Sequence, residues 1–161
     1  MFTGALAASY YGTPRTTMDI DIVVEASRKE SLTRLVSALE MAGLEVDRRR
    51  IDAALRSSFR IVTVKDAKTP FTVAIILSSA KLDKRPGSIM GLPTFYQTPE
   101  GLILAKLRMT KAAVPRERAL KDEDDVRAIL KHTRVQMNAL RKQTRRNNTL
   151  SILDVIASSD L

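Results

Sequence analysis

The first part of the chain alternates between helical and β-type hydrophobic patterns. Residues 4–11 are small and apolar and predict a short helix, which Gly12 and Pro14 end. Residues 18–25 alternate at first between polar and apolar side chains and then become fully apolar and β-branched. This pattern predicts a strand with one solvent-exposed end. Residues 28–42 place apolar side chains at helical spacing and predict an amphipathic helix that covers a sheet.

The middle of the chain has the pattern of a β-hairpin. Residues 59–65 and 71–77 are β-rich, and the short polar segment 66–70 joins them, so we expect an antiparallel pair. With the earlier strand they give a sheet of three strands or more. Residues 82–97 are rich in turn-forming residues and predict irregular structure, with a short edge strand at 94–96 as its one regular element.

From Thr98 onwards the pattern is helical. Thr98 is expected to cap a helix with Pro99 at its first position. Further helices are expected over residues 121–131, 134–145 and 148–158. The second half of the chain therefore predicts a cluster of helices.

These elements predict an α+β fold with a small mixed or antiparallel sheet, covering helices and a C-terminal helical part. We expect residues 1–97 to form the core, and residues 98–161 to form a helical extension packed on the same domain. A chain of 161 residues with 44% hydrophobic and 28% charged residues is typical of a globular protein. The first helix starts close to Met1, and one explanation is an upstream segment that this sequence does not contain.

The net charge of +9 is unevenly distributed along the chain. The second half has the larger basic excess, so RNA, nucleotide phosphates and an acidic protein partner are all candidates for a bound polyanion. The densest basic runs, Arg48–Arg50 and Arg141–Arg146, are expected to be solvated, with RNA contact as the alternative. The absence of cysteine excludes disulfides and thiolate zinc sites, and no apolar run approaches the length of a membrane span. We expect a cytoplasmic protein without a membrane partner.

Two acids on the first predicted strand are the candidate chemistry. Asp19 and Asp21 are separated by one residue, so the period of a strand points both carboxylates to the same face. Two neighbouring carboxylates repel each other unless a cation lies between them, and hard oxygen ligands favour Mg²⁺ or Mn²⁺. The alternative is a pair of solvated acids near the end of a strand.

The surrounding residues add to this pattern. Gly4 and Ala5 open the first helix, residues 11–17 read Tyr-Gly-Thr-Pro-Arg-Thr-Thr, and residues 18–21 read Met-Asp-Ile-Asp. This run resembles the nucleotidyltransferase superfamily, whose signature is a Gly-Gly or Gly-Ser at a helix start followed by a hydrophobic–Asp–hydrophobic–Asp strand. It looks most like the minimal nucleotidyltransferases and the related antitoxin-type enzymes, and a weaker similarity extends to residue 131.

The resemblance implies a polymerase-beta-like sheet that binds a nucleoside triphosphate and a divalent metal. Asp19 and Asp21 would be the metal ligands and catalytic residues, and Gly4, Ala5, Arg15 and Lys106 would bind the nucleotide. It also implies transfer of a nucleoside monophosphate to a hydroxyl, for example one on a toxin-like protein partner. Bracing of a nearby acid by Arg15 and simple solvation of Lys106 are the alternatives.

The sequence departs from the family pattern at one position. Members of the superfamily generally carry a third acid on a later strand, and the corresponding position here is Ala74. Either Glu25, Asp66 or Asp83 substitutes for it, or the chain binds nucleotide and metal without efficient transfer. The alternative function is an inactive module of the same fold that binds RNA or an acidic protein through its basic helical half. A third interpretation is an unrelated α+β interaction protein.

Overall fold

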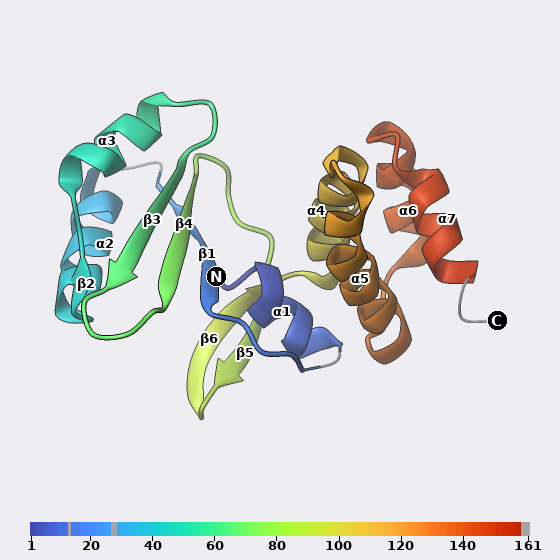
Figure 1. The fold of residues 1–161 in the computed structure, drawn as a ribbon, viewed down its shortest axis with the longest axis horizontal. Coiled ribbons are helices and arrows are strands. Elements are labelled where there is room, and N and C mark those ends of the chain that lie inside the picture. The colour runs from blue at the N-terminus through green and yellow to red at the C-terminus, as the bar shows by residue number, and fades with distance from the viewer. Residues whose placement is uncertain (13, 27–28, 159–161) are drawn as a thin grey trace. The chain divides into compact units, whose positions relative to one another are not determined.

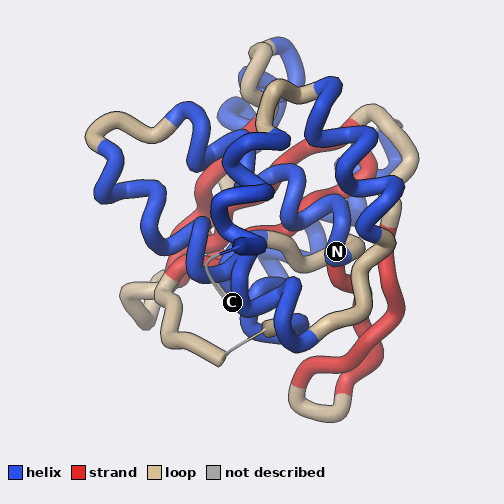
Figure 2. Tube along the Cα trace, turned by 90° about the vertical axis from the view of Figure 1, so that its right-hand side faces the viewer, coloured by secondary structure: helices blue, strands red, loops and turns tan. Residues whose placement is uncertain are grey.

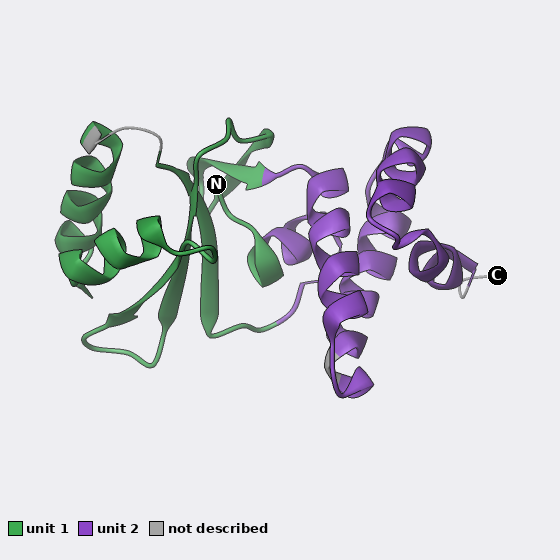
Figure 3. Cartoon of the chain, turned by 90° about the horizontal axis from the view of Figure 1, so that it is seen from above, with its two compact units in different colours: residues 1–6, 16–96 green, residues 7–15, 97–161 purple. Residues whose placement is uncertain are grey.

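The computed structural model describes residues 1–12, 14–26 and 29–158 (Figure 1). Thr13 of the Tyr-Gly-x-Pro-Arg stretch and Arg28 of the predicted helix 28–42 lie outside the described residues. The chain has two compact units (Figure 3). Unit 1 contains residues 1–6 and 16–96, and unit 2 contains residues 7–15 and 97–161. The short helix α1 (Gly4–Tyr11) begins in unit 1 and continues into unit 2.

Unit 1 is built on a mixed sheet, whose strands are β1 (Asp19–Glu25), β2 (Leu44–Glu45), β3 (Ile61–Asp66) and β4 (Thr72–Ser78). Among the described residues the strand order is β1-β4-β3-β2. β1 runs parallel to β4, whereas β3 is antiparallel to both β4 and β2. The predicted hairpin is confirmed as β3 and β4, and the mixed α+β architecture is confirmed with it.

One face of this sheet is covered by the helices α2 (Lys29–Met41) and α3 (Arg48–Arg56) (Figure 1). Alternate strand residues point towards these helices and form the core of unit 1. That core contains Val62, Val64, Val73, Ile75 and Leu77 from the sheet, with Val36, Leu39, Ile51 and Ala54 from the helices. Because strand side chains alternate, the residues between them lie on the opposite face.

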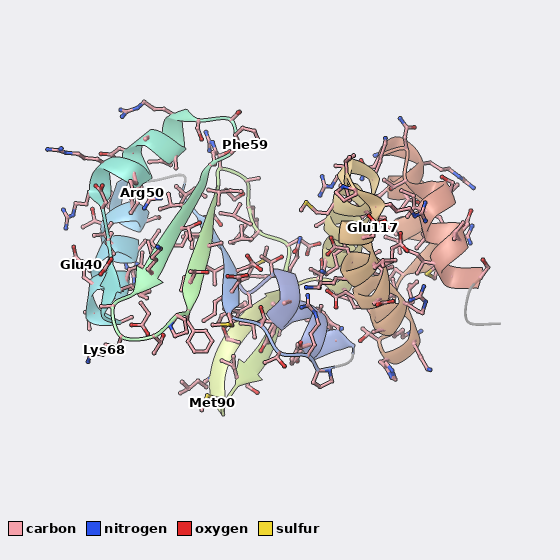
Figure 4. All side chains as sticks on the ribbon, viewed as in Figure 1. Glu40, Arg50, Phe59, Lys68, Met90 and Glu117 are labelled. Atoms are coloured by element: carbon pink, nitrogen blue, oxygen red, sulfur yellow. The ribbon has the colours of Figure 1, made fainter. Side chains whose placement is uncertain are left out.

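Unit 1 also contains a β-ribbon formed by β5 (Lys84–Ile89) and β6 (Leu92–Gln97), although Gln97 itself is grouped with unit 2. Its two-residue turn has positive φ at both Met90 and Gly91, which is the geometry of a type I′ hairpin. Figure 2 shows the two strands as a ribbon that ends in a loop, and Figure 4 labels Met90 at its tip. Phe2 forms bridges to Ile22 of β1 and Tyr96 of β6, so the N-terminal segment joins the ribbon to the sheet.

Unit 2 is helical. Its principal helices are α4 (Pro99–Ala112), α5 (Leu120–His132), α6 (Met137–Arg146) and α7 (Leu150–Ser158), with the 3₁₀ turn η1 (Arg116–Ala119) before α5. α4 packs against the other three helices and supplies the buried residues Leu102, Ile103 and Leu107. The Thr98 side chain accepts a hydrogen bond from the Gly101 amide and confirms the predicted cap. None of the described helices is long and apolar enough to cross a membrane.

One sequence prediction is wrong, and one helix is not predicted. Residues 82–97 are not irregular, because two strands and a type I′ turn occupy most of them. The run Arg48–Arg50 is exposed as expected, yet it forms the first turn of α3, which the sequence analysis does not predict. Asp47 caps this helix by accepting a hydrogen bond from the Arg49 amide.

Candidate functional site

The two predicted acids lie on the open face of the unit 1 sheet. Ile20 and Ile22 pack against the core beneath α2 and α3, so Asp19 and Asp21 point to the opposite side of β1. In the parallel register of β1 with β4, Asp19 is paired with Thr72 and Asp21 with Ala74. Paired residues of neighbouring strands share a face, so all four side chains lie on the open side.

A hydroxyl on the adjacent strand holds one of the carboxylates. Thr72 Oγ1 donates a hydrogen bond of 2.6 Å to Asp19 Oδ1. The backbone amide of Asp19 donates to Thr17 Oγ1 at 3.2 Å, which orders the chain just before the strand. Asp19 is exposed, so its second carboxylate oxygen remains accessible to a ligand. The sequence does not predict Thr72 as a site residue. The observation that could have identified it is its position two residues before Ala74, on the same face of the strand.

Asp21 lies against the start of α1. Gly4 has a φ of +58°, and a Cβ placed on it would lie 2.0 Å from Asp21 Oδ2 and 2.7 Å from Asp21 Cγ. Only glycine has room at this position and adopts this φ without strain. The Thr3 amide also donates a hydrogen bond of 2.9 Å to the Asp21 carbonyl oxygen. The predicted glycine and the second predicted acid are therefore in direct contact.

This contact places a carboxylate beside the N-terminus of a helix. α1 has eight residues and begins at Gly4, with Ala5 buried at its second position. The first amides of a helix lack partners within the helix, and they attract anions together with the helix dipole. The arrangement can accept an anion at the helix start and a cation on the carboxylates of the neighbouring strand.

The position of the expected third acid is beside Asp21 and carries no carboxylate. Ala74 pairs with Asp21 on β4, and Thr63 of β3 pairs with Ala74 on its other side. Within residues 1–12, 14–26 and 29–158, no group of three histidine, cysteine or acidic side chains is suitable for a metal ion. Mg²⁺ is commonly bound by one or two carboxylates, with waters and substrate phosphates completing its octahedron, so Asp19 and Asp21 fit such an ion.

The acids considered as substitutes lie elsewhere in unit 1. Glu25 shares the open face, but it is four residues beyond Asp21, which is about 13 Å along a strand. Asp66 follows Lys65, the register partner of Thr72, so its side chain points to the opposite face of the sheet. Hydrogen bonds from the Thr69 hydroxyl and the Lys68 amide lower the pKa of Asp66. Asp83 is exposed in the segment before β5.

Arg15 and Lys106, which the resemblance assigns to the nucleotide, belong to an ion cluster within unit 2. Arg15 Nε and Nη2 donate to the two carboxylate oxygens of Asp125, each at 3.0 Å. Lys106 Nζ lies 2.7 Å from Asp125 Oδ2 and 2.8 Å from Asp122 Oδ1. Lys106 and Asp125 are both buried, so each charge is compensated where water is scarce.

This pairing gives Arg15 the bracing role that was the alternative in the sequence analysis. The bidentate geometry fixes the guanidinium on Asp125, and a phosphate would have to compete with that carboxylate. Nucleotide binding by Arg15 and Lys106 stays a prediction. Gly4, Ala5, Asp19 and Asp21 are the predicted residues that unit 1 gathers in one region.

Comparison with known proteins adds no family to this description. No protein-family model matches the chain, and no curated protein is significantly similar to it. Any functional interpretation therefore depends on the chemistry of the residues described above.

Proposed function

We propose that unit 1 binds a nucleoside triphosphate together with Mg²⁺ or Mn²⁺ at Asp19, Asp21 and the start of α1. The observation that carries this proposal is the contact between Gly4 and Asp21. The close approach between this helix start and the carboxylate requires glycine, because the position has a positive φ and no room for a Cβ. It is useful where the helix amides receive a phosphate whose counterion sits on that carboxylate.

Each residue has a distinct role in this proposal. The amides of Gly4 and Ala5 would donate to oxygens of the triphosphate, and Asp19 and Asp21 would hold the cation, which would offset the negative charge of those oxygens. Thr72 fixes one oxygen of Asp19 and leaves the other for the cation. The apolar layer beneath the sheet keeps β1 and β4 in register, so the two carboxylates stay on one face.

We propose further that nucleotide transfer is slow in this chain. In the resembling enzymes the transfer is an attack by an acceptor hydroxyl on the α-phosphorus, with release of pyrophosphate. Ala74 can neither accept the hydroxyl proton nor bind a cation, and the loss of a general base commonly costs a factor of about 10²–10⁴ in rate. The resemblance favours a hydroxyl of a toxin-like protein partner as the acceptor.

Calorimetry tests the binding step. We expect ATP or GTP to bind in the presence of Mn²⁺, and we expect Asp19→Asn/Asp21→Asn to abolish this binding. The matched control is Glu45→Gln/Asp52→Asn, which removes two exposed carboxylates from the same unit and leaves the site intact. If neither nucleotide binds up to millimolar concentration, or if both double variants bind equally well, the proposed site is wrong.

A further inference from the structure

The outer face of α6 in unit 2 carries a dense group of cations. Leu140 and Thr144 are fully buried and attach the helix to its neighbours. Lys142, Arg145 and Arg146 are exposed on the same helix. The first and last of these three differ by four residues, which is about 6 Å along a helix. We call these three residues the α6 basic face.

No carboxylate among the described residues forms an ion pair with the α6 basic face. α6 itself has no acidic residue, and Asp154 of the neighbouring helix α7 is paired with Arg141 at 2.9 Å. This pair neutralises the fourth cation of α6 and leaves the other three. By contrast, Arg15 and Lys106 in the same unit are both compensated by the buried Asp125.

A further cation extends this surface. Lys111 of α4 directs its ammonium group to the carbonyl oxygen of Asn147, at 3.5 Å. Asn147 directly follows Arg145 and Arg146 in the chain, so Lys111 lies at the C-terminal end of the α6 basic face. Lys111 is itself exposed and has no ion pair within the described part of the chain.

The composition of this surface selects among polyanions. An anionic membrane or an amphipathic acidic helix needs apolar contacts, whereas the exposed residues of α6 are polar, charged or Ala139. Base stacking of single strands needs aromatic side chains, and residues 97–161 contain no Phe, Tyr or Trp. Duplex nucleic acid carries about one negative charge per 1.7 Å of its axis, which is close to the density of three cations over about 6 Å.

We propose that the α6 basic face and Lys111 bind the phosphate backbone of duplex nucleic acid without reading its sequence. This site is separate from the nucleotide site proposed on β1, and it does not require Asp19 or Asp21. Four phosphate contacts give a slope of about −3.6 for log K against log salt. Affinity should then fall by about 150-fold between 50 and 200 mM salt.

Fluorescence anisotropy of the full chain with labelled 20-base-pair RNA and DNA duplexes tests this proposal. We compare the wild type with Lys142→Gln/Arg145→Gln/Arg146→Gln. The matched control is Arg48→Gln/Arg49→Gln/Arg50→Gln, which removes the same charge from another exposed helix. In the α6 variant the slope of log K against log salt should become shallower by about 2.7. The α3 control and Asp19→Asn/Asp21→Asn should bind duplex as the wild type does. Circular dichroism checks that each variant is folded.

Several outcomes overturn the proposal. Equal losses in the α6 variant and the α3 control would indicate attraction by net charge alone. Tighter binding of single strands than of duplexes, or displacement of the duplex by poly-glutamate at an equal charge concentration, would indicate another class of polyanion. Equal binding of RNA and DNA duplexes supports recognition of the phosphate backbone. Tighter binding of RNA duplexes also supports it, and indicates that the site fits the A-form geometry of the RNA backbone.

Discussion

Replacement of Gly4 by alanine tests the contact on which the candidate site depends. The new Cβ would lie 2.0 Å from Asp21 Oδ2, whereas ordinary van der Waals contact begins at 3.4 Å. The carboxylate must therefore retreat by about 1.4 Å, and Asp21 Cβ, at 2.9 Å, limits how far the side chain can turn away. Such a displacement moves the carboxylate away from the helix start.

The cost of Gly4→Ala has two parts. Alanine in the left-handed region of backbone space costs about 1–2 kcal/mol, and overpacking against Asp21 costs about 1–3 kcal/mol more. Gly91→Ala separates the two parts, because Gly91 also has a positive φ but has no atom within 4 Å of an added Cβ. We expect about 1–2 kcal/mol of destabilisation for Gly91→Ala and about 2–5 kcal/mol for Gly4→Ala.

Urea unfolding followed by circular dichroism measures both free energies of unfolding. Asp21→Ala removes the two atoms closest to the new methyl group, so Gly4→Ala should cost less in that background than in the wild type. Gly4→Ala should also weaken Mn²⁺ binding, which Gly91→Ala leaves unchanged. Equal costs for the two glycine variants, with no coupling to Asp21, would refute the described contact.

Three further substitutions probe the site and the two units. Ala74→Asp adds a carboxylate beside Asp21 and should tighten Mn²⁺ binding by at least tenfold in a calorimetric titration, because a third oxygen ligand reaches the cation. Asp125→Ala leaves the buried Lys106 and the Arg15 guanidinium undercompensated, and should cost about 3 kcal/mol of unfolding free energy in urea. Thr69→Ala removes the main hydrogen bond that lowers the pKa of Asp66, so an NMR titration should show that pKa rising towards its ordinary value of 3.8.

Matched variants define the contradicting results. Thr63→Asp places a carboxylate on β3, one strand further from Asp21 than Ala74. Equal Mn²⁺ affinities of Thr63→Asp and Ala74→Asp would refute the claim that position 74 faces the cation. Asp124→Ala removes an exposed neighbour of Asp125, and equal destabilisation would show that the buried cluster contributes nothing. The pKa of Asp66 is lowered in the folded state, so its carboxylate stabilises the fold at pH values above the unfolded pKa. This stabilisation is lost as the pH falls through the folded pKa, and Thr69→Ala should therefore reduce the acid-sensitive part of the free energy of unfolding. An unchanged Asp66 pKa would contradict this cause.

Local sequence signals predict most of the elements and the pairing of the β3–β4 hairpin, but not the pairing of strands that are distant in the chain. The amphipathic helix α2 and the hairpin of β3 and β4 follow from periodicity, because one side of each element is apolar. α3 was missed because its three leading arginines dominate the segment, although Asp47 before them and Ile51 and Ala54 beneath them were signals of a capped helix.

The strands of the β5–β6 ribbon contain turn-forming residues, which obscure the β pattern in the sequence. Pro86 and Gly87 suggested irregular structure, but both lie within β5, whose only partner among the described residues is β6. A proline is tolerated where its missing amide is not needed by a neighbouring strand. The parallel pairing of β1 with β4 joins residues more than 50 positions apart, so no short-range pattern could specify it.

The candidate site was predictable where it depends on one strand and a helix start. The alternation of Asp19 and Asp21 placed both on one face, and the Gly4 signal coincides with a close approach of the backbone. Thr72 and the ion cluster around Asp125 depend on contacts between distant segments. The sequence alone therefore left Arg15 with two roles, and the cluster supplies a partner for the bracing role.

The most direct test of the proposed nucleotide site is anomalous diffraction from crystals of the chain grown with Mn²⁺ and a non-hydrolysable ATP analogue. We expect a manganese peak between the carboxylates of Asp19 and Asp21, with the triphosphate reaching the amides of Gly4 and Ala5. A nucleotide bound on α6, or manganese bound at other carboxylates while Asp19 and Asp21 bind none, would contradict the account.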